Sequence, residues 1–334
     1  MSTLRTARAV AHSNIALCKY WGKRASDPPS LNLPATGSLS LTLDALWTET
    51  EVAPAAQDRF ELDGAVHADD AARKVFAQLD RLWRAAGHGG ARPAAAVRSV
   101  NHLPTAAGLA SSASGFAALT LAGMAAMGGA MERGPLSALA RQGSGSAARS
   151  LWGGFVRLDR GVRPDGEDCV ARPLFPANHW DVRLLVVQTT SGKKAIGSTA
   201  GMERSRTTSP YYAAWVDGSD ADLDRAQQAL AARDLATLGA VVEHSCFKMH
   251  ACMLASQPPF SYWNGTTLEV VRALWAAREA GLAGYATIDA GPHVKVLCEA
   301  ATAPALAKRL GELPGVVAVQ TCAPGPDASH EVLS

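Results

Sequence analysis

Residues 103–115 read LPTAAGLASSASG, and they stand directly before the apolar run FAALTLAGMAAM at 116–127. The apolar run favours a helix, whereas the stretch before it is almost entirely Ala, Ser and Gly. A Gly-rich segment that leads into a helix N-terminus presents unpaired N–H groups at the positive end of the helix dipole, and this combination favours phosphate. Close packing of the helix against a sheet explains the same small residues. The stretch alone does not decide between the two interpretations.

Composition limits the function classes that remain. The 334 residues carry 32 basic and 30 acidic side chains, a formal net charge of +2, so we expect no nucleic-acid partner and only a local anion site. The six cysteines form no CxxC pair, which argues against a disulfide framework and against a zinc site. The sequence lacks an apolar signal segment and a run of about 20 apolar residues, so we expect a cytoplasmic protein without membrane contact.

Periodicity along the chain predicts alternating strands and helices, hence a mixed α and β protein. We expect a helix over 72–87 with Phe76, Leu79 and Trp83 on one face, and further helices within 220–256 and over 267–281. The expected strands cover 96–103, 155–161, 180–189, two within 285–300, and a final one over 316–324. The Pro-containing stretch 163–178 is expected to be a loop, which places a domain boundary near 179 and divides the chain into 1–178 and 179–334.

The segment NIALCKYWGKR at 14–24 brings two lysines, Lys19 and Lys23, close together where a strand breaks. Two lysines four residues apart often form only a solvated face. Tyr20 and Trp21 between them indicate a wall beside a site instead. Both interpretations stay open from these residues alone.

The segment QGSGSAARSLWGGF at 142–155 resembles a second helix start among small residues, with Arg149 in the first turn. A cation at the positive end of a helix is unfavourable by about 0.3–1 kcal/mol unless an anion offsets both charges. This favours an anion site at Arg149. The alternative is an ion pair between Arg149 and a nearby carboxylate.

The segment TIDAGPH at 287–293 is typical of a turn between strands, because Asp caps turns and Gly tolerates positive φ. Asp289 is equally compatible with a catalytic carboxylate at the end of a strand. The sequence contains no Walker motif, no Rossmann fingerprint and no His-Glu metal helix. We interpret His250 and His293 as structural residues.

Seven motifs together resemble, in order, those of the diphosphomevalonate decarboxylase family of the GHMP kinase superfamily. They are NIALCKYWGKR, LNLPATGSLSLTLD, LPTAAGLASSASGFAAL, GSGSAARSLWGGF, STAGM, PPFSYWN and DAGPHVKV, and the resemblance extends from Asn14 to about residue 326. It implies a GHMP kinase fold, with an N-terminal domain of the ribosomal-protein-S5 type and a C-terminal ferredoxin-like domain. It further implies a homodimer that uses ATP and Mg²⁺ to convert mevalonate 5-diphosphate to isopentenyl diphosphate, ADP, phosphate and CO₂.

The resemblance also assigns roles to individual positions. For the ATP phosphates it implies Pro104, Ala106, Ala107, Gly108, Leu109, Ala110, Ser111 and Ser112, with Ser112 also at the metal. For the substrate it implies Lys19, Tyr20, Trp21, Gly22, Lys23, Arg73, Ser144, Gly145, Ser146, Ala147, Ala148, Arg149 and Thr208. Catalytic roles fall on Asp289, Arg149 and Lys23, with Asp289 as the catalytic aspartate and Arg149 near the substrate carboxylate.

Four positions depart from the usual family pattern: His293 stands for Asn, Gly37 for Ser, Ala148 for Cys and Gly197 for Ser. None of them removes a charged group, but they leave the substrate open. Related enzymes act on mevalonate 5-phosphate, or phosphorylate the C3 hydroxyl of mevalonate and stop. A non-catalytic metabolite-binding relative is a further alternative, although it is expected to lose the aspartate or the phosphate loop. Retention of the charged set that includes Lys19, Arg149 and Asp289 favours the complete decarboxylase.

Overall fold

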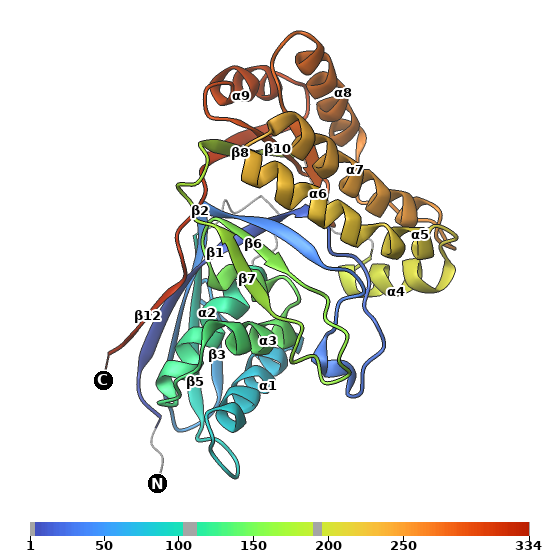
Figure 1. The fold of residues 1–334 in the computed structure, drawn as a ribbon. Helices are drawn as coiled ribbons and strands as arrows, with labels where there is room; N and C mark the ends of the chain where they lie inside the picture. Colours follow the sequence, from blue (N-terminus) through green and yellow to red (C-terminus); the bar gives the residue numbers. More distant parts are fainter. Residues whose placement is uncertain (1–3, 103–111, 190–195, 334) are drawn as a thin grey trace.

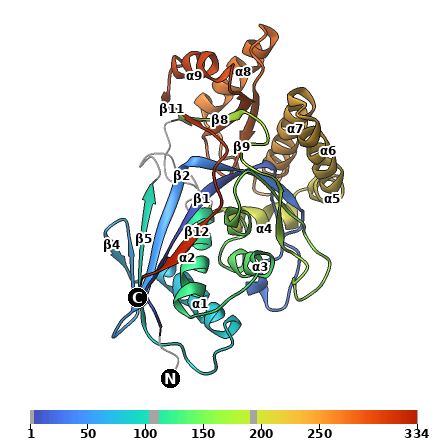
Figure 2. The same cartoon turned by 60° about the vertical axis from the view of Figure 1, so that its left-hand side comes forward.

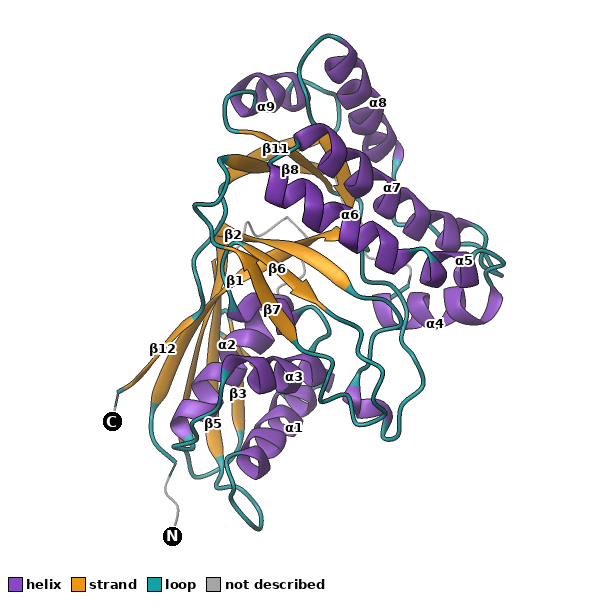
Figure 3. Ribbon diagram, in the orientation of Figure 1, coloured by secondary structure: helices purple, strands orange, loops and turns teal. Residues whose placement is uncertain are grey.

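The computed structural model describes residues 4–102, 112–189 and 196–333. Within these ranges the chain forms two parts, each built on its own β-sheet (Figure 1). The larger sheet carries helices α1, α2 and α3 on one face (Figure 3). The smaller sheet and its helices form the second part. The predicted mixture of α and β structure is therefore confirmed.

The larger sheet contains eight of the described strands, in the order β12-β1-β2-β5-β3-β4, with β6 paired to β2 and to β7. Their bounds are β1 Ala7–Cys18, β2 Ser38–Pro54, β3 Arg59–Leu62, β4 Ala65–His67, β5 Ala95–His102, β6 Phe155–Leu158, β7 Ala171–Phe175 and β12 Ser329–Val332. The sequence-based expectation included none of β2, β3 and β4, and it was wrong for two further segments. Strand β7 lies inside the expected loop 163–178, and β12 follows the strand expected to be last and pairs with β1 (Figure 2).

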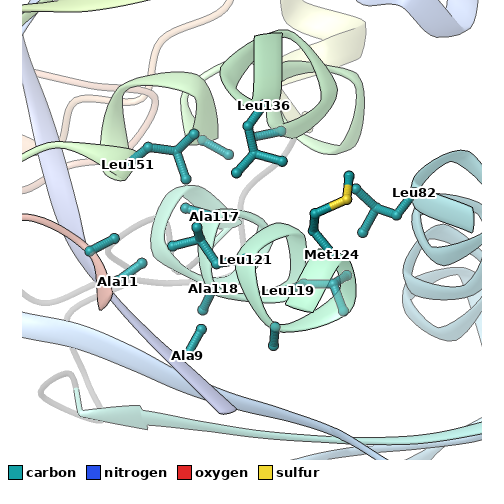
Figure 4. Close-up of a cluster of buried hydrophobic side chains, with 14 of the residues drawn as sticks. Ala9, Ala11, Leu82, Ala117, Ala118, Leu119, Leu121, Met124, Leu136 and Leu151 are labelled. Carbon is teal, nitrogen blue, oxygen red and sulfur yellow. The ribbon is translucent and has the colours of Figure 1, made fainter. Parts of the chain in front are cut away.

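Helices α1 (Asp70–Ala85), α2 (Ser112–Ala126) and α3 (Arg133–Gly143) cover this sheet. In α1 the predicted apolar face is confirmed, because Leu79 and Trp83 are buried and Phe76 packs against the same core. Helix α2 is surrounded by apolar side chains, and alanines on both α2 and β1 let the two backbones lie close together (Figure 4). The small residues of α2 therefore do serve close packing on the sheet.

The smaller sheet has the strand order β11-β8-β10-β9. The elements of this part are β8 Val182–Thr189, α4 Ser198–Thr208, α5 Tyr212–Asp217, α6 Ser219–Ala232, α7 Leu235–Leu254, α8 Gly265–Glu279, β9 Tyr285–Ile288, β10 Val294–Glu299, α9 Ala303–Gly311 and β11 Val316–Cys322. Helices connect the first strand to the second and the third strand to the fourth, which is the ferredoxin-like arrangement. The predicted helical block 220–256 is divided at Arg233, whose φ of 53° ends α6, and Asp234 then caps α7.

A shared apolar core joins the two parts. Leu17 and Leu41 of the larger sheet lie in one buried cluster with Leu184 of β8, Leu223 of α6 and Leu238 of α7. A continuous core of this kind holds side chains from both parts at fixed positions relative to one another. In the described ranges no helix is both long and apolar enough to cross a membrane.

A fully buried arginine on α3 links two loops to the larger part through hydrogen bonds. Arg141 of α3 is 1% exposed and donates hydrogen bonds to the carbonyl oxygens of Leu31 (3.2 Å), Gly166 (3.1 Å) and Cys169. We expect Arg141→Met to lower the free energy of unfolding by about 2–4 kcal/mol, because it leaves these buried acceptors unpaired. Urea denaturation measures the change. Arg206→Met, which removes an exposed arginine, is the control and should cost less than about 1 kcal/mol. An equal loss in both variants would contradict this account.

Candidate active site

A cavity of about 840 Å³ lies where the two parts meet. Its walls come from the segment after β1, from one face of α1, from the start of α2, from residues 142–149, from the start of α4 and from the turn between β9 and β10. Segments far apart in the sequence thus contribute to one site. The charged side chains that line it define its chemistry.

Asp289 lies directly after β9, in the turn that leads to β10, and its carboxylate faces the cavity. Its Oδ1 accepts a hydrogen bond from Lys19 Nζ at 2.5 Å, and its Oδ2 lies 3.2 Å from Lys295 Nζ. Burial opposes ionisation of Asp289, but the two ammonium groups outweigh it and hold the pKa of this carboxyl well below its ordinary value. The turn interpretation is therefore confirmed, whereas the catalytic role of Asp289 stays a prediction that its ionised state and its place in the cavity favour.

Lys19 is not on a solvated face, since it is only 2% exposed. It follows the last residue of β1, and its backbone N–H donates to Ser245 Oγ at 2.9 Å. A buried ammonium group is unfavourable unless it is paired, and Asp289 supplies the pairing. The solvated-face interpretation is therefore wrong for Lys19.

Arg149 is also buried, with 2% of its surface exposed, and it lines the cavity. It donates from one terminal nitrogen to Ser38 Oγ at 2.6 Å and from Nε to Asn14 Oδ1 at 3.3 Å, and both acceptors are neutral. No carboxylate among the described residues forms a salt bridge with it, so the alternative of a structural ion pair is wrong within those ranges. Burial lowers the pKa of the Arg149 guanidinium to about 10. It remains a desolvated cation that an anion in the cavity would stabilise.

The structure gives a different reason to expect an anion site at Arg149 from the one given by the sequence. The segment Ala147–Leu151 is a five-residue 3-10 turn and not the first turn of an α-helix, so the helix-dipole argument does not apply. The anion site is expected instead because the Arg149 guanidinium is buried away from water. Asn14 orients this arginine, because its amide nitrogen donates to Ser146 O at 3.0 Å and to Ser150 Oγ at 2.8 Å while its Oδ1 accepts from Arg149.

A second group of cations consists of Lys23 and of the basic side chains Arg73, Lys74 and Arg81 on α1. Burial and the neighbouring Lys74 lower the pKa of Lys23. Arg73 pairs with Asp70, and Arg81 lies two helical turns from Lys74. In total, seven basic side chains and two carboxylates are among the described residues that line the cavity: Lys19, Lys23, Arg73, Lys74, Arg81, Arg149 and Lys295, with Asp70 and Asp289. This surplus of positive charge fits a substrate that carries several negative charges.

Known protein families match both parts. Residues 11–171 match the model of the diphosphomevalonate decarboxylase-like N-terminal domain, and residues 184–323 match that of the mevalonate 5-diphosphate decarboxylase C-terminal domain. The diphosphomevalonate decarboxylase of Candida albicans is 33% identical over 328 residues, which cover 93% of this chain and 90% of that relative. The chain belongs to the diphosphomevalonate decarboxylase family. The resemblance stated from the sequence is thereby confirmed.

Solved structures of diphosphomevalonate decarboxylases share the whole fold. A complex of MDDEF with MVAPP, AMPPCP and magnesium has a TM-score of 0.91 at 38% identity and covers 99% of this chain and 100% of its own. The mevalonate diphosphate decarboxylase of Staphylococcus aureus has a TM-score of 0.91 at 35% identity, with 98% of each chain covered. The predicted GHMP-type fold is confirmed by these matches.

Most of the other residues assigned from the family resemblance lie at or beside the cavity. Tyr20 lines it, and its ring packs against Gly145, where an added Cβ would lie 2.9 Å from the Tyr20 hydroxyl. Trp21 lines it as well, with only 2% of its surface exposed. Gly22 does not line it; its φ is +97°, and a Cβ there would lie 1.9 Å from the Tyr212 hydroxyl. Gly22 therefore allows Tyr212 to approach the backbone closely.

Three further assigned positions do not reach the cavity. Ala147 and Ala148 are fully buried in the core beneath it. Thr208 ends α4, where its hydroxyl donates to Arg204 O at 2.7 Å and accepts from Gln257 N at 2.9 Å. The structure thus brings Ser144, Gly145, Ser146 and Arg149 to the site, but not these three.

The phosphate-loop positions divide into two groups. Pro104, Ala106, Ala107, Gly108, Leu109, Ala110 and Ser111 lie outside the described residues. Ser112 begins α2, lines the cavity, and accepts a hydrogen bond from the Ser144 hydroxyl at 3.4 Å. The first turn of α2 is therefore directed at the same site as Asp289.

Asn14, Lys74, Arg81 and Lys295 are among the cavity residues that were not assigned from the sequence. The spacing of Lys74 and Arg81 on the predicted helix was a usable signal, because residues seven apart lie on one helical face. Asn14 stood at the start of a quoted motif. Lys295 gave no signal, since a single lysine in a strand is compatible with either face of a sheet.

Proposed function

We propose that this chain catalyses the ATP-dependent decarboxylation of mevalonate 5-diphosphate to isopentenyl diphosphate, with release of ADP, phosphate and CO₂. The observation that carries the proposal is an ionised Asp289 in a cavity that two separate groups of cations also line. The substrate has a diphosphate, a carboxylate and a tertiary hydroxyl. Each of these groups has a suitable partner in the cavity.

The inner cation, Arg149, binds the substrate carboxylate, because it is a buried guanidinium whose hydrogen bonds go only to neutral oxygens. The outer cations Lys23 and Arg73 bind the diphosphate beside Tyr20. With both ends held, the C3 hydroxyl faces Asp289. Positioning of this kind removes much of the entropic barrier to reaction.

In the first step the C3 oxygen attacks the γ-phosphorus of ATP, the bond to ADP breaks, and the hydroxyl proton passes through Asp289 to solvent. Phosphoryl transition states are loose, so little negative charge develops on the attacking oxygen. The low pKa of Asp289 makes it a weak base, and its main contribution is to hold the hydroxyl in line. In the second step the C3–O bond breaks and phosphate leaves. The carbon–carbon bond to the carboxylate then supplies the electron pair of the new double bond, and CO₂ departs.

The site fits a metal that arrives with the nucleotide. Among the described residues no three His, Cys, Asp or Glu side chains are grouped as a metal site, whereas Mg²⁺ commonly keeps water and phosphate ligands. Ser112, at the start of α2 and on the cavity wall, would hold the ion together with the ATP phosphates. When bound, Mg²⁺ neutralises charge on the transferred phosphoryl group.

Incubation of the purified protein with ATP and, separately, mevalonate, its 5-phosphate and its 5-diphosphate tests the substrate. We expect ADP and CO₂ in equal amounts with the 5-diphosphate, and a kcat/KM at least about tenfold lower with the other two, because they leave the outer cations without a partner. ADP without CO₂ would identify a kinase, and neither product would identify a binding protein. Preference for the 5-phosphate would also contradict the proposal.

Two further properties are proposed, the first from the family resemblance and the second from the sequence and the cysteines. We propose a homodimer, which light scattering of the purified protein tests; a monomer mass at all concentrations would contradict it. We also propose a cytoplasmic location. All six cysteines are free and buried in the structure, as expected for a reducing compartment. Cell fractionation tests the location.

A further inference from the structure

Lys295 of β10 is a buried cation for which the reaction above gives no role. It is 3% exposed, and its neighbours across the sheet are Thr287 of β9 and Val186 of β8. Its Nζ lies 3.2 Å from Asp289 Oδ2 and donates to the carbonyl oxygen of His293 at 3.3 Å. Lys295 thus lines the cavity beside Asp289.

The two lysines contact different oxygens of the same carboxylate. Lys19 donates to Oδ1 from the end of β1, in the larger part, whereas Lys295 contacts Oδ2 from β10, in the smaller part. Asp289 thus forms an ion pair with one lysine from each part of the chain. Burial of two lysines costs solvation free energy, which points to a role of this arrangement at the site.

We propose that Lys295 is a positioning residue for the reaction: it holds Oδ2 of Asp289 while Lys19 holds Oδ1, and this fixes the carboxylate in one orientation as an ionised hydrogen-bond acceptor for the substrate hydroxyl. The catalytic part of this inference rests on the proposed function. The part that concerns the ionisation of Asp289 does not.

Other groups near Asp289 do not take over this role. Cys246 and His250 of α7 both bond the carbonyl oxygen of Ile288, and burial raises the pKa of Cys246 to about 11 and lowers that of His250 to about 3, so both are uncharged at neutral pH. His293, in the turn, accepts a hydrogen bond at Nδ1 from Thr189 N at 3.1 Å, as a neutral ring does.

Arg149 is the remaining charged group that acts on Asp289, and its hydrogen bonds go to Ser38 and Asn14. Lys19 and Lys295 are therefore the two cations that contact the carboxylate among the described residues. Opposite charges favour the ionised form, so removal of one lysine raises the pKa of Asp289. Activity needs the ionised carboxylate. As the pH is lowered, a variant without one of the lysines therefore loses activity at a higher pH than wild type does.

The first test compares Lys295→Met with wild type over pH. We expect the acidic limb of the kcat/KM profile to move to higher pH by about 1–3 units, and kcat near neutral pH to fall at least about tenfold while KM for ATP changes less than about threefold. The matched control is Lys248→Met, which removes a lysine paired with Asp222 outside the cavity. Its acidic limb should stay in place. An unmoved limb in Lys295→Met would overturn the proposal.

A double-mutant cycle separates positioning from a structural role. In the Asp289→Asn background, Lys295→Met should change kcat/KM by less than about threefold, because the group that Lys295 holds is already neutral. Equal losses in both backgrounds would overturn the proposal.

A carbon-13 titration of the Asp289 carboxyl tests ionisation without any turnover, with the signal assigned by its loss in Asp289→Asn. Lys295→Met should raise the titration midpoint, and an unchanged midpoint would count against the inference. If wild type releases no CO₂, the proposed function fails, whereas this titration still tests the pairing.

Discussion

Asp289→Asn is expected to lower kcat for CO₂ release by about 10³-fold. The amide is similar in size to the carboxylate, but it places an N–H donor or a weaker acceptor where the C3 hydroxyl needs a strong acceptor. The substitution also leaves Lys19 and Lys295 without their anionic partner. The cavity then gains positive charge, so KM for the anionic substrate should stay the same or fall. Rapid-quench measurement of ADP and CO₂ determines both constants.

Asp181→Asn is a matched control, because Asp181 is an exposed aspartate whose side chain is 78% accessible and lies outside the cavity lining. Its kcat should stay within about twofold of wild type. A kcat for Asp289→Asn within about tenfold of wild type would remove the role assigned to Asp289. A large rise in KM with an unchanged kcat would mean that Asp289 binds substrate but does not orient the hydroxyl.

Arg149→Met is expected to lower kcat/KM for the substrate by about 10²–10³-fold, because it removes the cation that holds the carboxylate during loss of CO₂. KM for ATP should change less than about threefold. The free energy of unfolding of this variant should change far less than its activity. Arg149 lines the cavity and bonds only two side-chain oxygens, which can reorient or bond water after its removal, so the free energy of unfolding should change by less than about 1 kcal/mol.

Arg141→Met is the natural comparison, since Arg141 is equally buried and yet bonds three backbone carbonyl oxygens. The two variants should separate function from stability: loss of activity in the first and loss of stability in the second. A strongly destabilised Arg149→Met would indicate that Arg149 is a structural residue. Equal loss of ATP binding and turnover would also contradict its assignment to the carboxylate.

Much of the fold was predictable because its elements show local patterns. The apolar face of α1 and the alternation in β5 follow from side-chain periodicity. Strands β7 and β12 were not predictable in this way. Both are short, and β12 is a polar, exposed Ser-His-Glu-Val segment that is a strand only because β1 offers it an edge more than 300 residues away in the sequence.

The site was predictable to a similar extent. Asp289 and Arg149 stand in stretches of small residues and turns, which mark positions where the backbone approaches a ligand. Lys295 stands in the strand VKVLCE, where a single lysine gives no information about its partner. The spacing of Lys74 and Arg81 places both on one helix face, but only the tertiary structure shows that this face lines the cavity. The missing information was the tertiary arrangement.

A crystal structure of the protein with mevalonate 5-diphosphate would test the account most directly. We predict that the C3 oxygen of the substrate lies within about 3.2 Å of a carboxylate oxygen of Asp289, with the substrate carboxylate against Arg149 and the diphosphate near Lys23 and Arg73. A substrate bound in the reverse direction, with its diphosphate at Arg149 and its C3 hydroxyl directed away from Asp289, would contradict the account.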